Sequence, residues 1–292
     1  MRALMDRGCV QAPGAFNALC ARAVAAAGFE AQYVSGAATS VAAGVPDVGL
    51  LTMEHFCRVI REVADAAPAL PVIADADTGF GESEMARRTV IEYSRAGAAA
   101  LHIEDQVFPK RCGHLDGKKL IPIDHQCEKI AAAAAAAKEM GNGFVICART
   151  DARGVEGIDA VVKRSEAYVQ AGADMIFPEG LQSEDEFTLV AQRLRPRGGL
   201  GRAGGPYLLA NMTEFGKTPI IPVQRFAHMG YSCVIHPVSM LRVAMGAVTR
   251  ALATLKKDGS VHASLDEMQT REELYGLIGY TPGKEWSFPV GQ

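Results

Sequence analysis

The sequence predicts an α/β protein that folds as a single (β/α)8 barrel of the TIM type. Short, near-continuous apolar segments alternate with longer stretches rich in Ala, Glu, Arg and Leu, which is the pattern of parallel strands covered by helices. About eight such units in a chain of 292 residues favour a closed barrel over an open sheet. No Pro/Ser-rich linker divides the chain, so we expect one domain over residues 1–292.

The strands are expected where the apolar segments fall. They are predicted at residues 9–12, 32–35, 72–75, 100–104, 144–148, 175–177, 207–210 and 232–235. Four helical stretches end in a glycine just before the next strand, at Gly28, Gly97, Gly172 and Gly230. Glycine readily adopts the left-handed conformation that ends a helix, so this recurrence supports repeated strand–helix units. The C-terminal segment, about 242–292, is expected to be helical up to about Tyr280 and irregular from Trp286.

Two conspicuous segments are assigned to the scaffold. The alanine run at 131–137 predicts a helix on the outside of the barrel, because alanine is the best helix former. Residues 199–204 match G-x-G-x-x-G, but they precede a predicted strand and open no helix. A phosphate-binding loop needs the opposite order, so we interpret this segment as a flexible connector at the far end of the barrel.

Composition excludes several classes of function. The net charge of −3 and the pI near 6.2 give no basic surface for nucleic acid or an anionic membrane. No apolar run reaches the roughly 18 residues that span a bilayer, and the N-terminus has no signal-peptide core. The seven cysteines are scattered singly, which fits a reducing cytoplasm better than a disulfide or zinc framework.

Polar side chains follow the predicted strands, and a barrel enzyme builds its site at this C-terminal end. Asp75 and Asp77 stand after the third strand, and Glu104 and Asp105 end the fourth. Two carboxylates at this spacing can face one cation, and oxygen ligands suit Mg²⁺ or Mn²⁺. The alternative is that one aspartate caps a helix or folds the turn.

Cys112 lies in a glycine-containing, cation-rich segment, Lys110-Arg111-Cys112-Gly113-His114. Positive neighbours favour the thiolate, so we predict a reactive thiol that exchanges a proton near neutral pH. With Gly113 and Gly117 as hinges, residues of about 106–120 can close as a gate over the barrel mouth. The alternative is a small buried hydrophobe, which we expect for the other six cysteines.

Three arginines are candidate carboxylate clamps: Arg149, Arg242 and Arg271. A guanidinium fork holds a carboxylate through two parallel hydrogen bonds, although each arginine could equally form a surface salt bridge. Three together indicate a substrate with two or three carboxylates. Glu179 and Asn211 could position a hydroxyl or enolate oxygen, whereas His102 is expected to be packed with its nitrogens satisfied.

The same residues resemble the isocitrate lyase/phosphoenolpyruvate mutase superfamily from about Gln11 to Tyr280. The motifs that carry the resemblance are Ser35-Gly36, Pro46-Asp47, Asp75-Ala76-Asp77-Thr78-Gly79, His102-Ile103-Glu104-Asp105-Gln106, Lys110-Arg111-Cys112-Gly113-His114 and Ala148-Arg149-Thr150-Asp151. Residues 209–216, 237–242 and 268–275 are most similar to the 2-methylisocitrate lyases.

The resemblance implies an Mg²⁺-dependent carbon–carbon lyase that cleaves 2-methylisocitrate to pyruvate and succinate. It implies metal ligands at Asp75 and Asp77, with Asp47 and Glu104 acting through water. The implied substrate contacts are Ser35, Gly36, Ala37, Cys112, Gly113, Arg149, Glu179, Asn211, Thr213, Arg242 and Arg271. Cys112 would be the proton donor and Glu104 a candidate base. The resemblance also implies a homotetramer whose last helices swap between subunits.

Three alternatives stay open. The chain could be an oxaloacetate hydrolase, a lyase for isocitrate or 2,3-dimethylmalate, or a barrel that only binds a ligand. Pro237 and Arg242 favour a lyase, because the hydrolases commonly carry serine at the first position and lack arginine at the second. Ala37 stands where many 2-methylisocitrate lyases have glycine, which leaves the size of the pocket open by one methyl group.

Overall fold

The computed structural model describes residues 1–113, 115–196 and 201–287. Its centre is a sheet of eight parallel strands in the order β1-β8-β7-β6-β5-β4-β3-β2. The strands are β1 (Val10–Pro13), β2 (Gln32–Val34), β3 (Val72–Asp75), β4 (Ala98–Glu104), β5 (Val145–Thr150), β6 (Met175–Pro178), β7 (Tyr207–Asn211) and β8 (Cys233–His236). A parallel bridge between Gly14 and Tyr33 joins the two edge strands, so the sheet is a nearly closed barrel.

All eight predicted strands are present, with ends shifted by one or two residues. The helices between them are α1 (Arg2–Arg7), α2 (Ala18–Ala26), α3 (Gly36–Ala42), α4 (Met53–Ala66), α5 (Ser83–Arg95), α6 (Ile123–Met140), α7 (Ile158–Gln170), α8 (Glu184–Leu194) and α9 (Val223–His228). Short 3-10 turns, η1 (Ala152–Gly154) and η2 (Gly201–Gly204), complete the barrel. The four predicted stop glycines all have positive φ, for example 103° at Gly97.

Each strand alternates between two cores. Side chains such as Ile73, Ala100 and Leu209 fill the barrel. Met1, with Leu4 and Met5 of α1, closes the end at which the strands begin, which we call the lower end. The residues between them in sequence pack outward against the helices. The expected alanine run lies in α6, where Ala133 and Ala136 are buried among the outer helices. Small side chains allow such close helix packing, and this prediction is confirmed.

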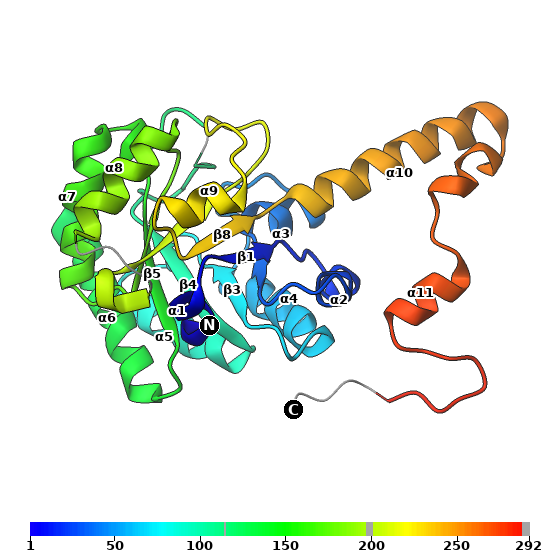
Figure 1. The fold of residues 1–292 in the computed structure, drawn as a ribbon, viewed down its shortest axis with the longest axis horizontal. Helices are drawn as coiled ribbons and strands as arrows, with labels where there is room; N and C mark the ends of the chain where they lie inside the picture. Colours follow the sequence, from blue (N-terminus) through cyan, green and yellow to red (C-terminus); the bar gives the residue numbers. More distant parts are fainter. Residues whose placement is uncertain (114, 197–200, 288–292) are drawn as a thin grey trace.

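The C-terminal segment leaves the barrel. Helix α10 (Ser239–Asp258) projects away from it, and the turn η3 (His262–Glu267) and α11 (Arg271–Leu277) follow on this arm (Figure 1). Leu241 is the one residue of α10 that is buried. The segment is therefore helical as predicted. In the described ranges, no helix combines the length and the apolar character needed to cross a membrane.

The glycine-rich segment lies at the lower end, as expected, directly before β7. Of its residues, 199 and 200 lie outside the described part of the chain, and Gly201–Gly204 form η2. The buried Arg195 donates to the carbonyl of Gly201 over 2.8 Å. In the described part of the chain, the element before this turn is helix α8 and the element after it is strand β7, so the turn lacks the strand–turn–helix order that a phosphate-binding loop requires.

Candidate active site

The strand register brings the predicted polar side chains together at the end of the barrel where the strands finish, which we call the upper mouth. Asp75 pairs with His102 across β3 and β4, and Glu104 pairs with Arg149 across β4 and β5. Because alternate residues of a strand share one face, these side chains point into the same space. Each of these four residues is buried.

Two aspartates and one lysine form the first half of the site. The Nζ atom of Lys110 lies 2.8 Å from Asp77 Oδ1 and also pairs with Asp47. Asp75 accepts hydrogen bonds from the backbone N–H groups of Gly36, at 2.9 Å, and Asp77, at 3.0 Å. The backbone of Asp77 has φ of 45°, a left-handed conformation that few residues other than glycine adopt. The ammonium group of Lys110 thus pairs with Asp77 of this turn and with Asp47, and Asp75 lies two residues before Asp77.

Gly36 leaves no room for a side chain beside Asp75. A Cβ atom at this position would lie 2.6 Å from Asp75 Oδ2, closer than real contacts allow. The Ser35 side chain instead caps α3 by accepting from the N–H of Ala38. The family resemblance implies that Ser35, Gly36 and Ala37 contact the substrate. In this structure the Gly36 N–H is donated to Asp75.

Burial dominates the acid–base behaviour of these groups. It raises the pKa of Asp77 to about 6, although Lys110 opposes the rise. It also raises the pKa of Glu104 well above the usual range, against the attraction of Arg149 and Lys110. Burial works against the charged form of Lys110 too, but Glu104, Asp77 and their neighbours outweigh it and raise the pKa of this amine. The lysine therefore stays charged.

Arg149 forms the second half of the site. Its Nε and Nη2 atoms donate to the two carboxylate oxygens of Asp151 over 3.0 and 3.1 Å. Its Nη1 atom lies 3.2 Å from Glu104 and 3.8 Å from Glu179. Asn211 donates to Glu179 over 3.0 Å. The predicted clamp is thus in the mouth, with one edge of its fork held by Asp151.

The predicted gate loop lies over this mouth. Its two ends pair at Gln106 and Leu120, and the Gln106 side chain holds the backbone of Arg111. Gly113 is buried, and a Cβ on it would lie 2.5 Å from both Arg149 Nη2 and Glu179 Cγ. Cys112, directly before it, is therefore at the mouth and half-buried. His114 of the predicted motif lies outside the described residues.

His102 is packed inside the barrel, but only one of its nitrogens is hydrogen-bonded. Its Nε2 lies 2.7 Å from the hydroxyl of Tyr33. Its Nδ1 has no hydrogen-bond partner among the described residues and lies 3.6 Å from Asp75 Oδ1. Burial lowers the pKa of His102 to about 4. The expectation that both nitrogens are satisfied is therefore wrong, because Nδ1 faces Asp75 at a distance beyond hydrogen bonding.

The remaining predicted contacts lie at the rim or beyond it. Thr213 is buried after β7, and Arg242 in α10 is 43% exposed, with its guanidinium against Glu214 and over the ring of Phe215. Arg271 is exposed at the start of α11, on the arm that leaves the barrel. A single chain therefore does not bring Arg271 to its own mouth.

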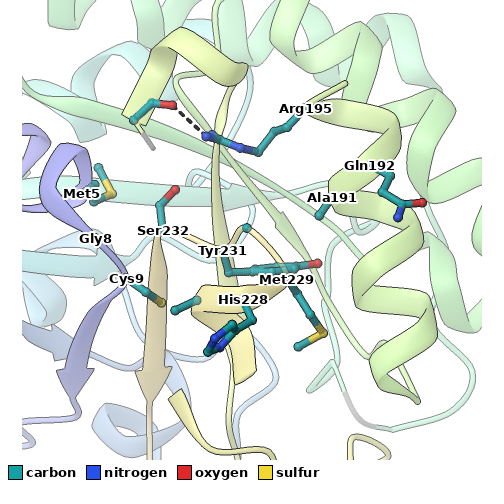
Figure 2. A pocket seen from close by; sticks show the side chains of 13 residues that line it. Met5, Gly8, Cys9, Ala191, Gln192, Arg195, His228, Met229, Tyr231 and Ser232 are labelled. Carbon is teal, nitrogen blue, oxygen red and sulfur yellow. Dashed lines mark hydrogen bonds between the residues drawn. The ribbon is translucent and has the colours of Figure 1, made fainter. Parts of the chain in front are cut away.

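A separate cavity of about 400 Å³ opens at the lower end of the barrel (Figure 2). It is lined by Met5, Cys9, Arg195, His228 and Tyr231, among others, around the beginnings of β1 and β8. None of the predicted site residues faces it. Since barrel enzymes place their chemistry at the other end of the strands, we assign the site to the upper mouth.

Sequence similarity assigns the chain to a family. A family model described as phosphoenolpyruvate phosphomutase matches residues 1–256. The chain belongs to the phosphoenolpyruvate mutase/isocitrate lyase superfamily. It is 48% identical to a Corynebacterium glutamicum protein named "Probable 2-methylisocitrate lyase 1", over 92% of this chain and 84% of the relative. It is 46% identical to the 2-methylisocitrate lyase of Aeropyrum pernix, over 96% of this chain and 86% of the relative.

Solved structures of the superfamily share the fold. A 2,3-dimethylmalate lyase superposes with a TM-score of 0.87 at 39% identity, covering 95% of this chain and 89% of the other. An oxaloacetate acetylhydrolase bound to 3,3-difluorooxalacetate gives 0.88 at 33% identity, covering 95% and 91%. A phosphonopyruvate hydrolase with oxalate and Mg²⁺ gives 0.81 at 30%, covering 95% and 93%.

The sequence analysis did not predict two contacts at the mouth, those of Lys110 with Asp47 and of Asp151 with Arg149. Lys110 was identified only as a cation near the thiol, and its contact with Asp47 spans 63 residues. Asp151 was part of a motif but had no assigned role. The signal for Asp151 was its position two residues after Arg149, which places both on one side of the strand end.

The cysteines differ in environment, and this predicts which one reacts. Burial raises the pKa of six of them, with the thiol of Cys9 at about 12; the others are Cys20, Cys57, Cys127, Cys147 and Cys233. At pH 8 the thiolate fraction of Cys9 is on the order of 10⁻⁴. With iodoacetamide at pH 8, peptide mapping should find Cys112 modified first. The fast phase should vanish in Cys112→Ser, and a buried cysteine that reacts as quickly would contradict this assignment.

Proposed function

We propose that this protein is an Mg²⁺-dependent carbon–carbon lyase that cleaves 2-methylisocitrate to pyruvate and succinate. The observation that carries the proposal is the position of Gly113, packed against Arg149 and Glu179. Cys112 directly precedes Gly113, which supports a thiol that acts beside a carboxylate clamp, next to the cluster around Asp75 and Asp77. Relatives at 46–48% identity over more than nine-tenths of the chain are named for this activity.

The residues of the mouth fit a hard divalent cation. Glu104 Oε1 is buried and accepts no hydrogen bond among the described residues. The buried Asp77 Oδ1 and Glu104 Oε2 have only ion-pair partners, Lys110 at 2.8 Å and Arg149 at 3.2 Å, which a bound cation would replace. Among the described residues, no three His, Cys, Asp or Glu side chains lie close enough together to hold a metal ion by themselves. Mg²⁺ keeps several waters and commonly takes one or two carboxylates, so Asp75 and Asp77 would hold it directly, and Asp47 and Glu104 through water.

The bound cation would polarise the hydroxyl and the adjacent carboxylate of the substrate. Arg149 would hold a second carboxylate through Nη1, which Asp151 does not occupy and which faces Glu104 and Glu179. Asn211 and Glu179 would position the reacting oxygens. Ser35, Gly36, Ala37 and Thr213 would line the substrate. Arg242 lies at the rim, where it could reach the far carboxylate.

The chemistry then needs two proton movements. A base removes the hydroxyl proton, the C2–C3 bond breaks, and its electron pair passes to C3 of the departing succinate. We assign the base to Glu104, acting through a water, because its carboxylate lies at the end of β4 inside the mouth, 3.2 Å from Arg149 Nη1. Cys112 donates its proton to C3, and Arg149 stabilises the charge that builds on the succinate carboxylate.

An oxaloacetate hydrolase is the second candidate, since the chain superposes on one with a TM-score of 0.88. Pro237 and Arg242 favour the lyase. The deciding experiment compares 2-methylisocitrate, isocitrate, 2,3-dimethylmalate and oxaloacetate side by side. We expect pyruvate and succinate from the first, with loss of turnover when EDTA is added and recovery with Mg²⁺ or Mn²⁺. Preference for oxaloacetate, or turnover that survives EDTA, would reject the proposal.

In the same assay, Cys112→Ser should retain substrate binding by calorimetry and lose turnover by about 100-fold or more, the range of general acid catalysis. Serine keeps the size of the side chain and removes its acidic proton. Cleavage at a rate close to wild type would show that another group protonates C3.

Gly36→Ala should disable the metal cluster without changing any charge. The added methyl group must displace the Asp75 carboxylate, so we expect a fall of about 100-fold in Mg²⁺-supported turnover. Gly8→Ala is the matched control, because a Cβ there meets nothing within 4 Å. Equal activity of both variants would show that the site tolerates a shift of Asp75.

We propose that the protein is a homotetramer whose C-terminal arms swap between subunits. Residues 241, 245, 248, 252 and 255 of α10 repeat at alternating steps of four and three, which makes an apolar stripe along the helix. Beyond Leu241 this stripe is exposed, including Leu252 at 59%. A swapped arm would bury the stripe and bring Arg271 of the partner subunit to a mouth that lacks it.

Light scattering should therefore give the mass of four 31.0 kDa chains. Leu252→Glu should dissociate this assembly, because a charge in an apolar contact is costly. Lys257→Glu, on the same helix with a fully solvated side chain, should leave it intact. A wild-type protein that runs as a monomer would contradict the proposal.

A further inference from the structure

A buried ion pair joins the gate loop to the barrel. Lys118 Nζ lies 3.0 Å from Asp151 Oδ1, and the two side chains are 5% and 0% exposed. The same ammonium group donates to the carbonyl oxygen of Gly113. A loop lysine that is almost fully buried is unusual, because lysine loses much side-chain entropy and hydration on burial. Its two partners, Asp151 and Gly113, explain why the lysine is buried.

The first partner, Asp151, is fixed by hydrogen bonds to both its backbone and its carboxylate. Its backbone N–H donates to Asp105 Oδ1 over 3.0 Å, and its carboxylate takes the fork of Arg149. Burial would raise the pKa of this carboxyl, but Arg149 and Lys118 outweigh it and lower the pKa. Asp151 is therefore a fixed, ionised acceptor at the top of β5. It offers the loop one rigid point of attachment.

The second partner, Gly113, is the residue after the thiol. The Leu115 N–H donates to the carbonyl of Cys112 over 2.9 Å, which closes a turn at this position. Lys118 then reaches back across the loop to Gly113. Because Gly113 rests on Arg149 and Glu179, the lysine fixes the Cys112–Gly113 backbone relative to the clamp.

We propose that Lys118 is a positioning residue for the reaction, holding the Cys112–Gly113 segment over the bound substrate by pairing with Asp151. This role rests on the lyase function proposed above. Protonation of a carbon needs the donor within hydrogen-bond reach, so a small displacement of the thiol costs rate and leaves substrate affinity largely intact. Lys118 acts through Cys112 and does not touch the reacting atoms.

The test compares Lys118→Met with Lys119→Met, which removes the same charge from the adjacent, exposed position. We expect Lys118→Met to lower kcat by about 100-fold while KM changes far less. Lys119→Met should behave as wild type. Lys118→Arg, which can still pair with Asp151, should recover part of the loss. A Lys118→Met enzyme with the wild-type kcat would overturn the proposal.

A second measurement needs no substrate. Trypsin cleavage after Arg111, followed by mass spectrometry, reports how often the loop leaves the barrel. It should be faster in Lys118→Met and in Lys118→Gln than in wild type or Lys119→Met. Cleavage at the wild-type rate in both Lys118 variants would overturn the proposal, even if one of them is less stable. If the wild-type protein cleaves none of the four acids, the proposed lyase function is rejected. The trypsin measurement still decides whether Lys118 holds the loop on the barrel.

Discussion

Charge buried at one end of the barrel is the constraint on which the rest of the site depends. Asp75, Asp77, Glu104, Asp151 and Glu179 all lie in a space that excludes most water. An isolated buried carboxylate is costly, so each needs a cation within reach. The strands themselves supply only Arg149 to this space.

The gate loop supplies the other two cations. Lys110 pairs with Asp77 and Asp47, and Lys118 pairs with Asp151. The loop is therefore more than a cover, because its docking also neutralises the cluster beneath it. Release of the loop would take Lys110 and Lys118 away from these carboxylates. Loop position and the charge of the mouth are thus coupled.

Much of this arrangement could be predicted from the sequence. The alternation of apolar segments with helices located all eight strands, and the polar residues after them indicated the mouth, because parallel strands bring their C-terminal ends together. Contacts between distant segments could not be predicted. The pairing of Lys110 with Asp47 and the unsatisfied nitrogen of His102 depend on side-chain positions that no periodicity encodes. Arg271 is a different case, since it lies on the arm that leaves the barrel, a position that its sequence motif does not encode.

The packed interior has a consequence for traffic through the barrel. Met5 and the side chains of the inner core fill the space below the mouth, so nothing can pass through the barrel from end to end. Whatever enters must leave by the same opening, beneath residues that rest on Arg149 and Glu179. An enzyme that makes two products from one molecule in such a dead-end chamber must open at least once to load and once to empty. In the proposed lyase, turnover could then be no faster than release of the docked loop.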